Sequence, residues 1–325
     1  CNQCKMFIRL QETSMGLDDS RAGISFALVC LVILGLMPFV SNSRPAAFDA
    51  LSFAFFLSVW QLLFSLPLVI RESLPKAKGI FAADLAPELK RRTTAIILLT
   101  GAIFGLSTYV YVLAVEKAGA VSAAIAIQAY PLFAILWETL FLGRRKTAPE
   151  LFFTLLLLVA LYYLATGGTW RIEGFSQWFA LALGIPFLWS IAHVVIKETM
   201  DRTPITPAQV TFFRVLVSAL LLGLLLVAIG GPSGVAKDLG NAEFQTFALI
   251  MGLVYYLELI FWFYAVRYIA VSTASLITIP WPALTIILAA LFLEESIGVH
   301  QIITLGVVAA SLYGLLFAGA RKRPG

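Results

Sequence analysis

Glu258 is the residue with the clearest chemical potential, because it stands alone in a long apolar stretch, LVYYLELIFWF at 253–263. A carboxylate among apolar groups is costly unless it is paired or protonated. On a helix, Tyr255, Glu258 and Trp262 share one face, because their spacing is i, i+3 and i+7. A carboxylate between two aromatic rings suits an ammonium group, through ion pairing and cation-π contact, or a proton. The alternative is a protonated glutamic acid that hydrogen-bonds a neighbouring helix.

Arg214 and His193 are the other ionisable residues placed to act as charge partners of a substrate. The guanidinium of Arg214 could bind a carboxylate, or it could extend to lipid phosphate while its stem stays in the apolar layer. His193 comes one turn before Lys197, so the alternative for it is a histidine at the membrane surface. The sequence leaves both pairs of interpretations open.

Aromatic and polar side chains in several apolar segments could form the walls of a binding site. The candidates are Tyr109, Tyr111, Gln128, Tyr130, Trp189, Thr278 and Trp281. They fall within the segments, whereas the aromatic belts of membrane proteins lie near the segment ends. Filling space between helices is the alternative for each of them.

Prolines interrupt two of the apolar segments. Pro131 lies in YPLF, and Pro280 and Pro282 lie in ITIPWPAL at 277–284. A proline inside a helix leaves the carbonyl one turn earlier without its usual donor and bends the chain. We therefore expect conformational kinks at these three residues.

The segments that carry these residues are expected to cross a membrane. Hydrophobic residues make up 60% of the chain, charged residues make up 13%, and the mean hydropathy is +0.92. One globular core could not bury so much apolar surface. A helix needs about 20 apolar residues to cross the hydrocarbon layer. Ten such stretches occur, at 23–40, 48–70, 94–115, 119–142, 151–168, 176–196, 208–230, 245–266, 271–293 and 298–319. The sequence therefore predicts an all-α polytopic membrane protein with ten transmembrane helices.

Lys and Arg residues are concentrated in alternate loops, of which 71–93 is the longest. Those on the opposite side are Arg44, Lys117, Arg171 and Lys237. The positive-inside rule then places both termini in the cytoplasm, with 1–22 as an N-terminal segment and 320–325 as a basic tail. We expect the bacterial inner (plasma) membrane. The loops are too short for a folded domain with a nucleic-acid-binding surface.

The second half of the chain repeats the first at a constant spacing of 151 residues. Residues 98–168 align with 249–319 without a gap. The matched pairs include Gly101 with Gly252, Tyr130 with Trp281, Pro131 with Pro282, and Gly168 with Gly319. A gapless alignment that matches glycines and prolines indicates a true internal repeat.

The two repeats, 23–168 and 176–319, each contain five of the expected spans. Because five is odd, the second repeat enters the membrane from the opposite side. The halves are then related by a two-fold axis in the membrane plane. Inverted repeats are typical of transporters that bind a substrate at the midplane and rock one half against the other.

The ends of the two repeats resemble a known family. The second contains IPWPALTIILAALFLEESIGVHQ at 279–301, in which Pro282 is followed by small apolar residues and by LFLE at 291–294, with Gly306 in the next span. The other matching segments are YPLFAILWETLFLGRR at 130–145, LWS at 188–190 and FFR at 212–214. These segments are similar to the EamA-type branch of the drug/metabolite transporter (DMT) superfamily, whose permeases contain two EamA repeats.

This resemblance implies that the third, fourth, eighth and ninth spans line a central cavity. The first repeat departs from the family pattern at two places. Gly143 stands where the second repeat has Glu294, and the arginine expected in the second span has no counterpart, Trp60 and Gln61 being the nearest polar residues.

Catalytic signatures are missing from the sequence. The interiors of the expected spans contain no Asp, and the chain has neither HExxH nor a P-loop, so we expect neither an intramembrane enzyme nor an ATP-driven pump. We also expect no cofactor and no metal. The sequence instead predicts a secondary active transporter, most simply an exporter, of small metabolites such as amino acids or amines, working by alternating access around a midplane cavity.

A nucleotide-sugar or sugar-phosphate exchanger of the same superfamily is the alternative function. Its substrates carry two or more negative charges and usually require several Lys or Arg side chains within the membrane. In the expected spans Arg214 is the single candidate for this role. A channel or sensor is a further alternative. The expected partners are the small-molecule substrate, protons and the lipid bilayer, with no nucleic acid, and the sequence fits a monomer and a homodimer equally.

Overall fold

The computed structural model describes residues 2–45, 47–73, 86–130, 132–133, 136–137, 147–171, 173, 175–269, 274 and 277–320. Side chains are described from residue 21 on, apart from residues 194, 197, 201, 316, 319 and 320. Within this part of the chain the secondary structure is helical, without strands. The helices are α1 (Asn2–Asn42), α2 (Ala50–Ser73), α3 (Pro87–Ala118), α4 (Ala120–Ile127), α6 (Ala148–Ala165), α7 (Gln177–Arg202), α8 (Pro207–Leu239), α9 (Ala242–Tyr268), α11 (Trp281–Phe292) and α12 (Val299–Ala320).

Polar side chains determine where several of these helices begin. Thr147 and Glu150 form a capping box at the start of α6, which satisfies two backbone N–H groups that have no partner within the helix. The single-residue caps of α7, α8 and α9 are Ser176, Thr206 and Asn241. α8 is interrupted at Gly231, where φ is 70°, a backbone conformation that glycine adopts without steric cost.

Seven of the described helices are long and apolar enough to cross a membrane. They are α1 from Arg21 on, α2, α3, α6, α7, α8 and α9, while α11 and α12 are shorter apolar helices. Large apolar side chains cover their outward faces, including Leu224 at 70% and Phe152 at 60% exposure. Such faces suit lipid, because a soluble protein rarely exposes so large an apolar surface. The chain is an integral membrane protein, and the predicted all-α polytopic class is confirmed.

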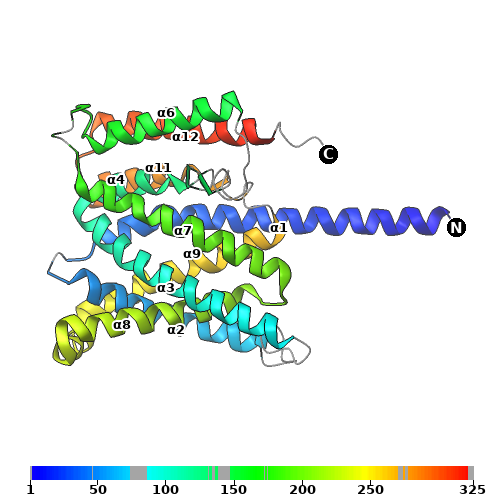
Figure 1. Cartoon of the computed structure of the whole chain (residues 1–325), viewed down its shortest axis with the longest axis horizontal. Helices are drawn as coiled ribbons and strands as arrows, with labels where there is room; N and C mark the ends of the chain where they lie inside the picture. Colours follow the sequence, from blue (N-terminus) through cyan, green and yellow to red (C-terminus); the bar gives the residue numbers. More distant parts are fainter. Residues whose placement is uncertain are drawn as a thin grey trace.

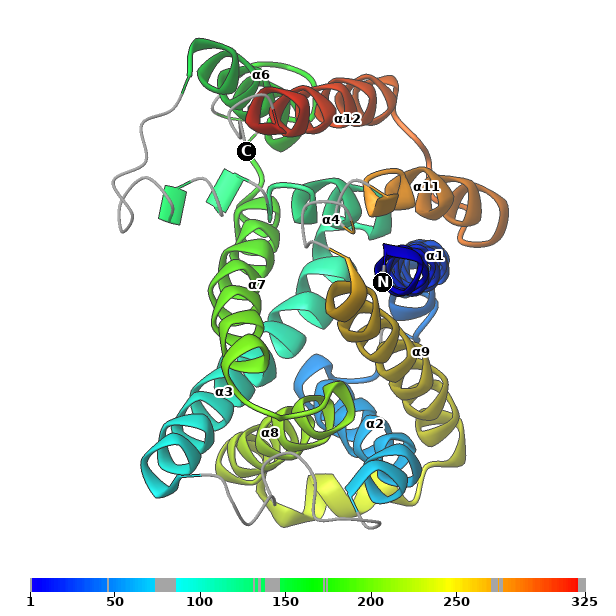
Figure 2. The ribbon, with the colours of Figure 1, turned by 90° about the vertical axis from the view of Figure 1, so that its right-hand side faces the viewer.

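Helices from the two halves interleave across the bundle (Figure 2). α1 packs against α9 and α3 packs against α7, while α2 pairs with α8, α4 with α11, and α6 with α12. The α2–α8 and α6–α12 pairs lie at opposite edges, with α4 and α11 between them. Exchanging each helix for its counterpart (α1 for α7, α2 for α8, α3 for α9, α4 for α11, α6 for α12) reproduces these pairs. The bundle therefore has pseudo-two-fold symmetry.

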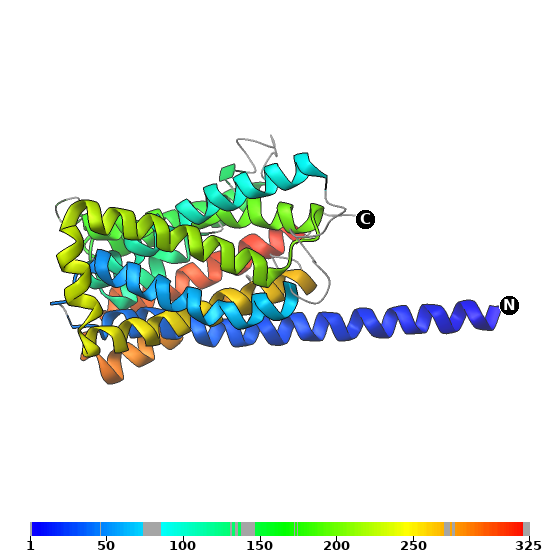
Figure 3. The same ribbon diagram turned by 90° about the horizontal axis from the view of Figure 1, so that it is seen from below.

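Equivalent helices run in opposite directions. α1 begins and α12 ends at the same end of the bundle (Figure 1), which we call the terminal end, and the opposite one is the distal end. α1 runs from the terminal to the distal end, whereas α7 runs back. The first turns of α1 extend beyond the bundle at the terminal end (Figure 3). Antiparallel equivalent helices place the pseudo-two-fold axis across the helices, so the prediction of two inverted five-helix repeats is confirmed.

Gly101 of α3 and Gly252 of α9 are equivalent glycines at equivalent helix contacts. A Cβ atom on Gly101 would lie 2.6 Å from the Cβ of Val217 in α8, and one on Gly252 would lie 2.7 Å from the Cβ of Trp60 in α2. Each would also lie close to a backbone oxygen, that of Arg214 at 3.0 Å from Gly101 and that of Leu57 at 2.8 Å from Gly252. Small residues allow helices in membranes to approach this closely, so the two repeats use the same packing device.

We predict that Gly252→Ala destabilises the protein by about 1–2 kcal/mol, the usual cost of overpacking. The added methyl group would lie 2.8 Å from the backbone oxygen of Leu57, and backbone cannot move aside as a flexible side chain can. A drop in the melting temperature of the purified protein in detergent measures the effect. Gly184→Ala is the control, because no atom lies within 4 Å of its Cβ position. Equal melting temperatures for the two variants would contradict the packing assignment.

Candidate functional site

Glu258 lies inside the bundle, on the face of α9 that also carries Tyr255 and Trp262. All three residues are buried, so the helical face identified in the sequence points toward other helices. The thiol of Cys30 in α1 lies 4.0 Å from Oε1 of Glu258, within the range of a weak hydrogen bond to sulfur. A thiol is a poor substitute for a cation or water, so the carboxylate has no strong partner among the residues that the structure describes.

Arg214 is also buried, with 5% of its surface exposed. Its guanidinium carbon lies 3.4 Å from the ring centroid of Phe104 in α3, and its Nε and Nη1 are buried without a hydrogen-bond partner. The alternative in which Arg214 extends to lipid phosphate is therefore wrong, since the side chain is directed into the bundle. Glu258 and Tyr255 are near enough to interact with it electrostatically.

His193 of α7 lies among aromatic rings from three other segments of the chain and from its own helix. The ring centroids closest to it belong to Phe104 (5.3 Å), Tyr130 (5.9 Å), Trp262 (5.9 Å), Phe263 (6.2 Å) and Trp189 (6.3 Å). Its Nδ1 is buried without a hydrogen-bond partner. The alternative of a histidine at the membrane surface is therefore wrong, because α7 turns this ring toward α3 and α9.

Tyr111, Trp189 and Tyr255 form a continuous aromatic wall. The ring of Tyr111 stacks on Trp189 with 6.4 Å between centroids, and it meets Tyr255 edge-on at 5.5 Å. The indole N–H of Trp189 donates to Ser107 Oγ at 3.0 Å, which fixes the orientation of the indole. The hydroxyl groups of Tyr111 and Tyr255 are buried without a partner. The wall thus presents unused polar groups beside Glu258.

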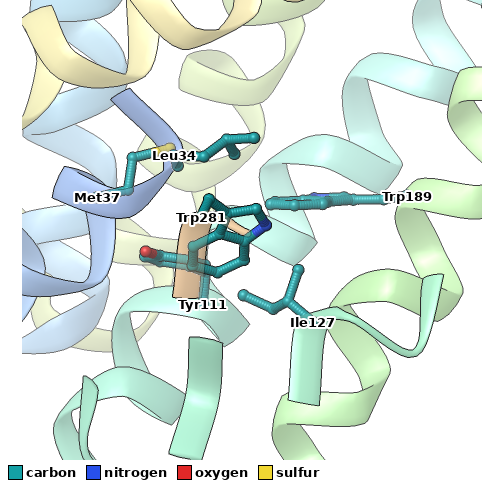
Figure 4. A pocket seen from close by; sticks show the side chains of 6 residues that line it. All are labelled: Leu34, Met37, Tyr111, Ile127, Trp189 and Trp281. Carbon is teal, nitrogen blue, oxygen red and sulfur yellow. The ribbon is translucent and has the colours of Figure 1, made fainter. Parts of the chain in front are cut away.

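A small pocket, with a cavity volume of about 10 Å³, adjoins this wall. The residues that line it are Leu34, Met37, Tyr111, Ile127, Trp189 and Trp281. In Figure 4, the rings of Tyr111, Trp189 and Trp281 lie around one space from three different helices. The pocket therefore joins α1, α3 and α4 of the first repeat to α7 and α11 of the second. Tyr109 is only half-buried and does not line this pocket.

The two repeats meet at equivalent breaks in their helices. The turn at Gln128–Ala129 follows α4, and the equivalent turn at Ile279–Pro280 precedes α11. Nε2 of Gln128 donates to the backbone oxygen of Ile279 at 2.5 Å, across a separation of 151 residues. Gln128 thus binds its own counterpart, which places this contact on the pseudo-two-fold axis.

The prolines occupy particular places around these breaks. Pro280 is in the turn, and Pro282 is in the first turn of α11, where its missing N–H costs no helical hydrogen bond. Thr278, just before the turn, is buried. Pro131 lies outside the described residues. A conformational role for the three prolines stays a prediction.

Charge breaks the symmetry of the site. At the spacing of 151 residues, Ser107 is the counterpart of Glu258, and Phe104 and Tyr111 are the counterparts of Tyr255 and Trp262. The aromatic positions are thus matched, but the carboxylate is not. Arg214 is unmatched as well. Its backbone oxygen lies beside Gly101, and the backbone oxygen of Leu57 lies beside the equivalent Gly252, so the counterpart of Arg214 in the first repeat is an uncharged leucine. Both charges of the site come from the second repeat.

Several residues of the site were not candidates in the sequence. Phe104 contacts Arg214, Cys30 contacts Glu258, and Ser107 accepts a hydrogen bond from Trp189. Each of the three looks like an ordinary apolar or small residue of a membrane helix. The spacing of 151 residues could have identified Phe104 and Ser107 as counterparts of Tyr255 and Glu258. Cys30 has no comparable signal, because a buried cysteine usually behaves as a small apolar residue.

Glu295 connects the repeats at the distal end of the bundle. Its carboxylate accepts hydrogen bonds from the backbone N–H groups of Ala120 (3.2 Å) and Val121 (3.4 Å), at the start of α4. Burial raises the pKa of this carboxyl group, and the two backbone hydrogen bonds oppose that shift. A carboxylate at a helix N-terminus is favourable, so Glu295 fastens the loop before α12 to the first repeat.

Comparison with known proteins identifies the family. The model of the EamA-like transporter family matches residues 21–166 and 176–317. The chain belongs to this family. The two matched segments correspond to the two inverted repeats of the structure, so the predicted membership in the DMT superfamily is confirmed.

A curated relative of the chain is named an exporter. The chain is 31% identical over 117 residues to the pseudopaline exporter CntI of Pseudomonas aeruginosa, in strains UCBPP-PA14 and PAO1. The alignment covers 36% of this chain and 38% of that exporter. A solved crystal structure aligns over 90% of this chain and 96% of its own, with a TM-score of 0.60 and 12% identity, which supports the fold alone. The family is a transporter family, and the relative is named an exporter.

Proposed function

We propose that this transporter is a secondary active exporter of small metabolites that carry an amino group, such as amino acids or amines. The observation that carries the proposal is Glu258, a buried carboxylate with a weak thiol partner. It lies in a cluster of aromatic side chains between the inverted repeats, formed by Tyr111, Trp189, Tyr255 and Trp262, which we call the chamber. An ammonium group would satisfy this carboxylate by ion pairing and by cation-π contact with Tyr255 and Trp262. A proton would satisfy it when the substrate leaves.

Alternating access follows from the symmetry of the bundle. The chamber lies where α3 and α7 meet α9, so rocking one repeat against the other would open it to each side of the membrane in turn. The distribution of Lys and Arg supports a bacterial inner membrane with the terminal end in the cytoplasm. The curated relative, itself named an exporter, supports transport outward.

Exchange of sugar phosphates or nucleotide sugars is the second candidate, and the charges in the chamber disfavour it. Such substrates carry two or more negative charges and require several cations. Among the described residues the buried arginines are Arg44 and Arg214, and Arg44 is paired with Glu116 near the distal end. One available cation beside a carboxylate suits a neutral or positively charged metabolite better.

Ligand-induced stabilisation of the purified protein in detergent tests this proposal. A ligand that binds the folded state raises the melting temperature in proportion to the logarithm of its concentration above Kd. We expect amino acids or amines to raise the melting temperature with this logarithmic dependence on concentration. Stabilisation by sugar phosphates or nucleotide sugars, with no effect of amino acids and amines, would favour the second candidate.

A further inference from the structure

We infer that Arg214 is the carboxylate-binding residue of the site, so that the transporter selects amino acids over the corresponding amines. This inference rests on the proposed function and makes its substrate class narrower. A metabolite that bears both an ammonium and a carboxylate would contact Glu258 with the first group and Arg214 with the second.

The first support is the unsatisfied guanidinium. Nε and Nη1 of Arg214 are buried and have no hydrogen-bond partner in the described part of the chain, although a buried arginine normally uses its donors. Phe104 covers one face of the guanidinium plane, and a ring face accepts a cation but does not satisfy directed N–H groups. A carboxylate is the ligand whose geometry matches a guanidinium best, because it accepts two parallel hydrogen bonds.

The second support is the arrangement of the two charges. Arg214 and Glu258 interact electrostatically, but the ion pairs of the described residues do not include one between them. Opposite charges in one apolar chamber would normally close into a direct pair, because their attraction is strong there. Tyr255, one turn before Glu258 on α9, interacts electrostatically with both charges, and among the described residues its buried hydroxyl has no hydrogen-bond partner.

The third support is the aromatic pocket beside the charges. Tyr111 belongs both to the wall near Glu258 and to the lining of the pocket. The other lining side chains, among them Leu34 and Trp281, are apolar or aromatic. A substrate held by its ammonium and carboxylate would therefore have an apolar surface next to it for its side chain.

Matched ligand pairs test the inference. Binding of L-leucine, L-phenylalanine and L-lysine is compared with binding of the amine that each gives on decarboxylation, by titration calorimetry of the purified full-length chain. We expect wild type to bind at least one amino acid about tenfold more tightly than its amine. A carboxylate bound by a buried arginine justifies this magnitude.

Arg214→Gln and Arg214→Lys separate a binding role from a structural one. We expect Arg214→Gln to weaken amino-acid binding about tenfold while amine binding stays within about twofold, and Arg214→Lys to recover part of the loss because it keeps the charge. Retained amine binding shows that the variants are folded. Arg202→Gln is the control, because Arg202 is an exposed arginine paired with Glu198.

The outcomes distinguish this inference from the proposed function. If wild type binds amines as tightly as amino acids, or if Arg214→Gln weakens both classes equally, the inference about Arg214 is wrong and the proposed function stands. If wild type binds neither class but binds sugar phosphates, the proposed function is wrong and the inference falls with it.

Discussion

Glu258→Gln is expected to reduce the transport rate about 100-fold and to remove the dependence of that rate on pH. Glutamine has nearly the same shape, but it can neither carry a negative charge for an ammonium group nor bind and release a proton. Removing one partner of a buried charge pair costs about 2–5 kcal/mol, and about 2.7 kcal/mol corresponds to a factor of 100 in rate. Uptake of labelled substrate into proteoliposomes, at several pH values, measures both effects.

Other titratable groups lie near Glu258, so control variants are needed to assign the pH dependence to its carboxyl group. The titratable groups that interact with it electrostatically are Cys30, Tyr111, Arg214 and Tyr255, and His193 faces the same chamber. Glu258→Asp keeps the carboxyl group and should keep a pH-dependent rate. Glu294→Gln is the matched control, because Glu294 is exposed. Wild-type rates and pH dependence in Glu258→Gln would exclude a role in binding or coupling.

Arg44→Gln is expected to destabilise the protein by about 2–3 kcal/mol. Arg44 donates to Glu116 and to the backbone oxygen of Phe48, and its side chain is only 2% exposed. Its loss would leave Glu116 short of its buried partner and Phe48 without a donor, and breaking a buried pair typically costs about 3–5 kcal/mol. We place the effect below that range because Glu116 is 22% exposed and can gain water. The melting temperature in detergent measures it.

Lys117 provides an internal control for this prediction. Its ammonium lies 2.7 Å from the other oxygen of Glu116, but its side chain is 43% exposed. An exposed ion pair contributes about 0–1 kcal/mol, so Lys117→Gln should change the melting temperature little. Equal destabilisation by both variants would mean that burial does not decide the strength of this pair.

The repeat was the part of the fold that the sequence predicted best. Glycine is required at both Gly101 and Gly252 because neighbouring helices approach closely there. Their spacing in the sequence is therefore a direct sign of the repeat in the structure. The spans 119–142 and 271–293 were predicted as single helices, whereas the structure has turns at Gln128–Ala129 and Ile279–Pro280. The prolines indicated a disturbance there, but the hydrogen bond between Gln128 and Ile279 depends on how the repeats meet.

The sequence also could not predict that the side chains of Arg214 and His193 face the inside of the bundle. Both are close to the ends of their spans, where a surface location is the simplest interpretation. Whether such a side chain faces lipid or the bundle depends on the rotation of its helix, which packing against Phe104 and Phe263 decides. Glu258 was easier to identify, because a carboxylate in the middle of a span has little access to the membrane surface.

Counterflow in proteoliposomes tests the central claim most directly. Vesicles that contain the purified protein are loaded with an unlabelled amino acid or amine, diluted into buffer with a trace of the same labelled compound, and followed without ATP. The account predicts transient accumulation of label with at least one such compound, and its loss in Glu258→Gln. Accumulation of sugar phosphates alone would contradict it. So would the absence of accumulation with every amino acid and amine tested, provided that the protein is folded.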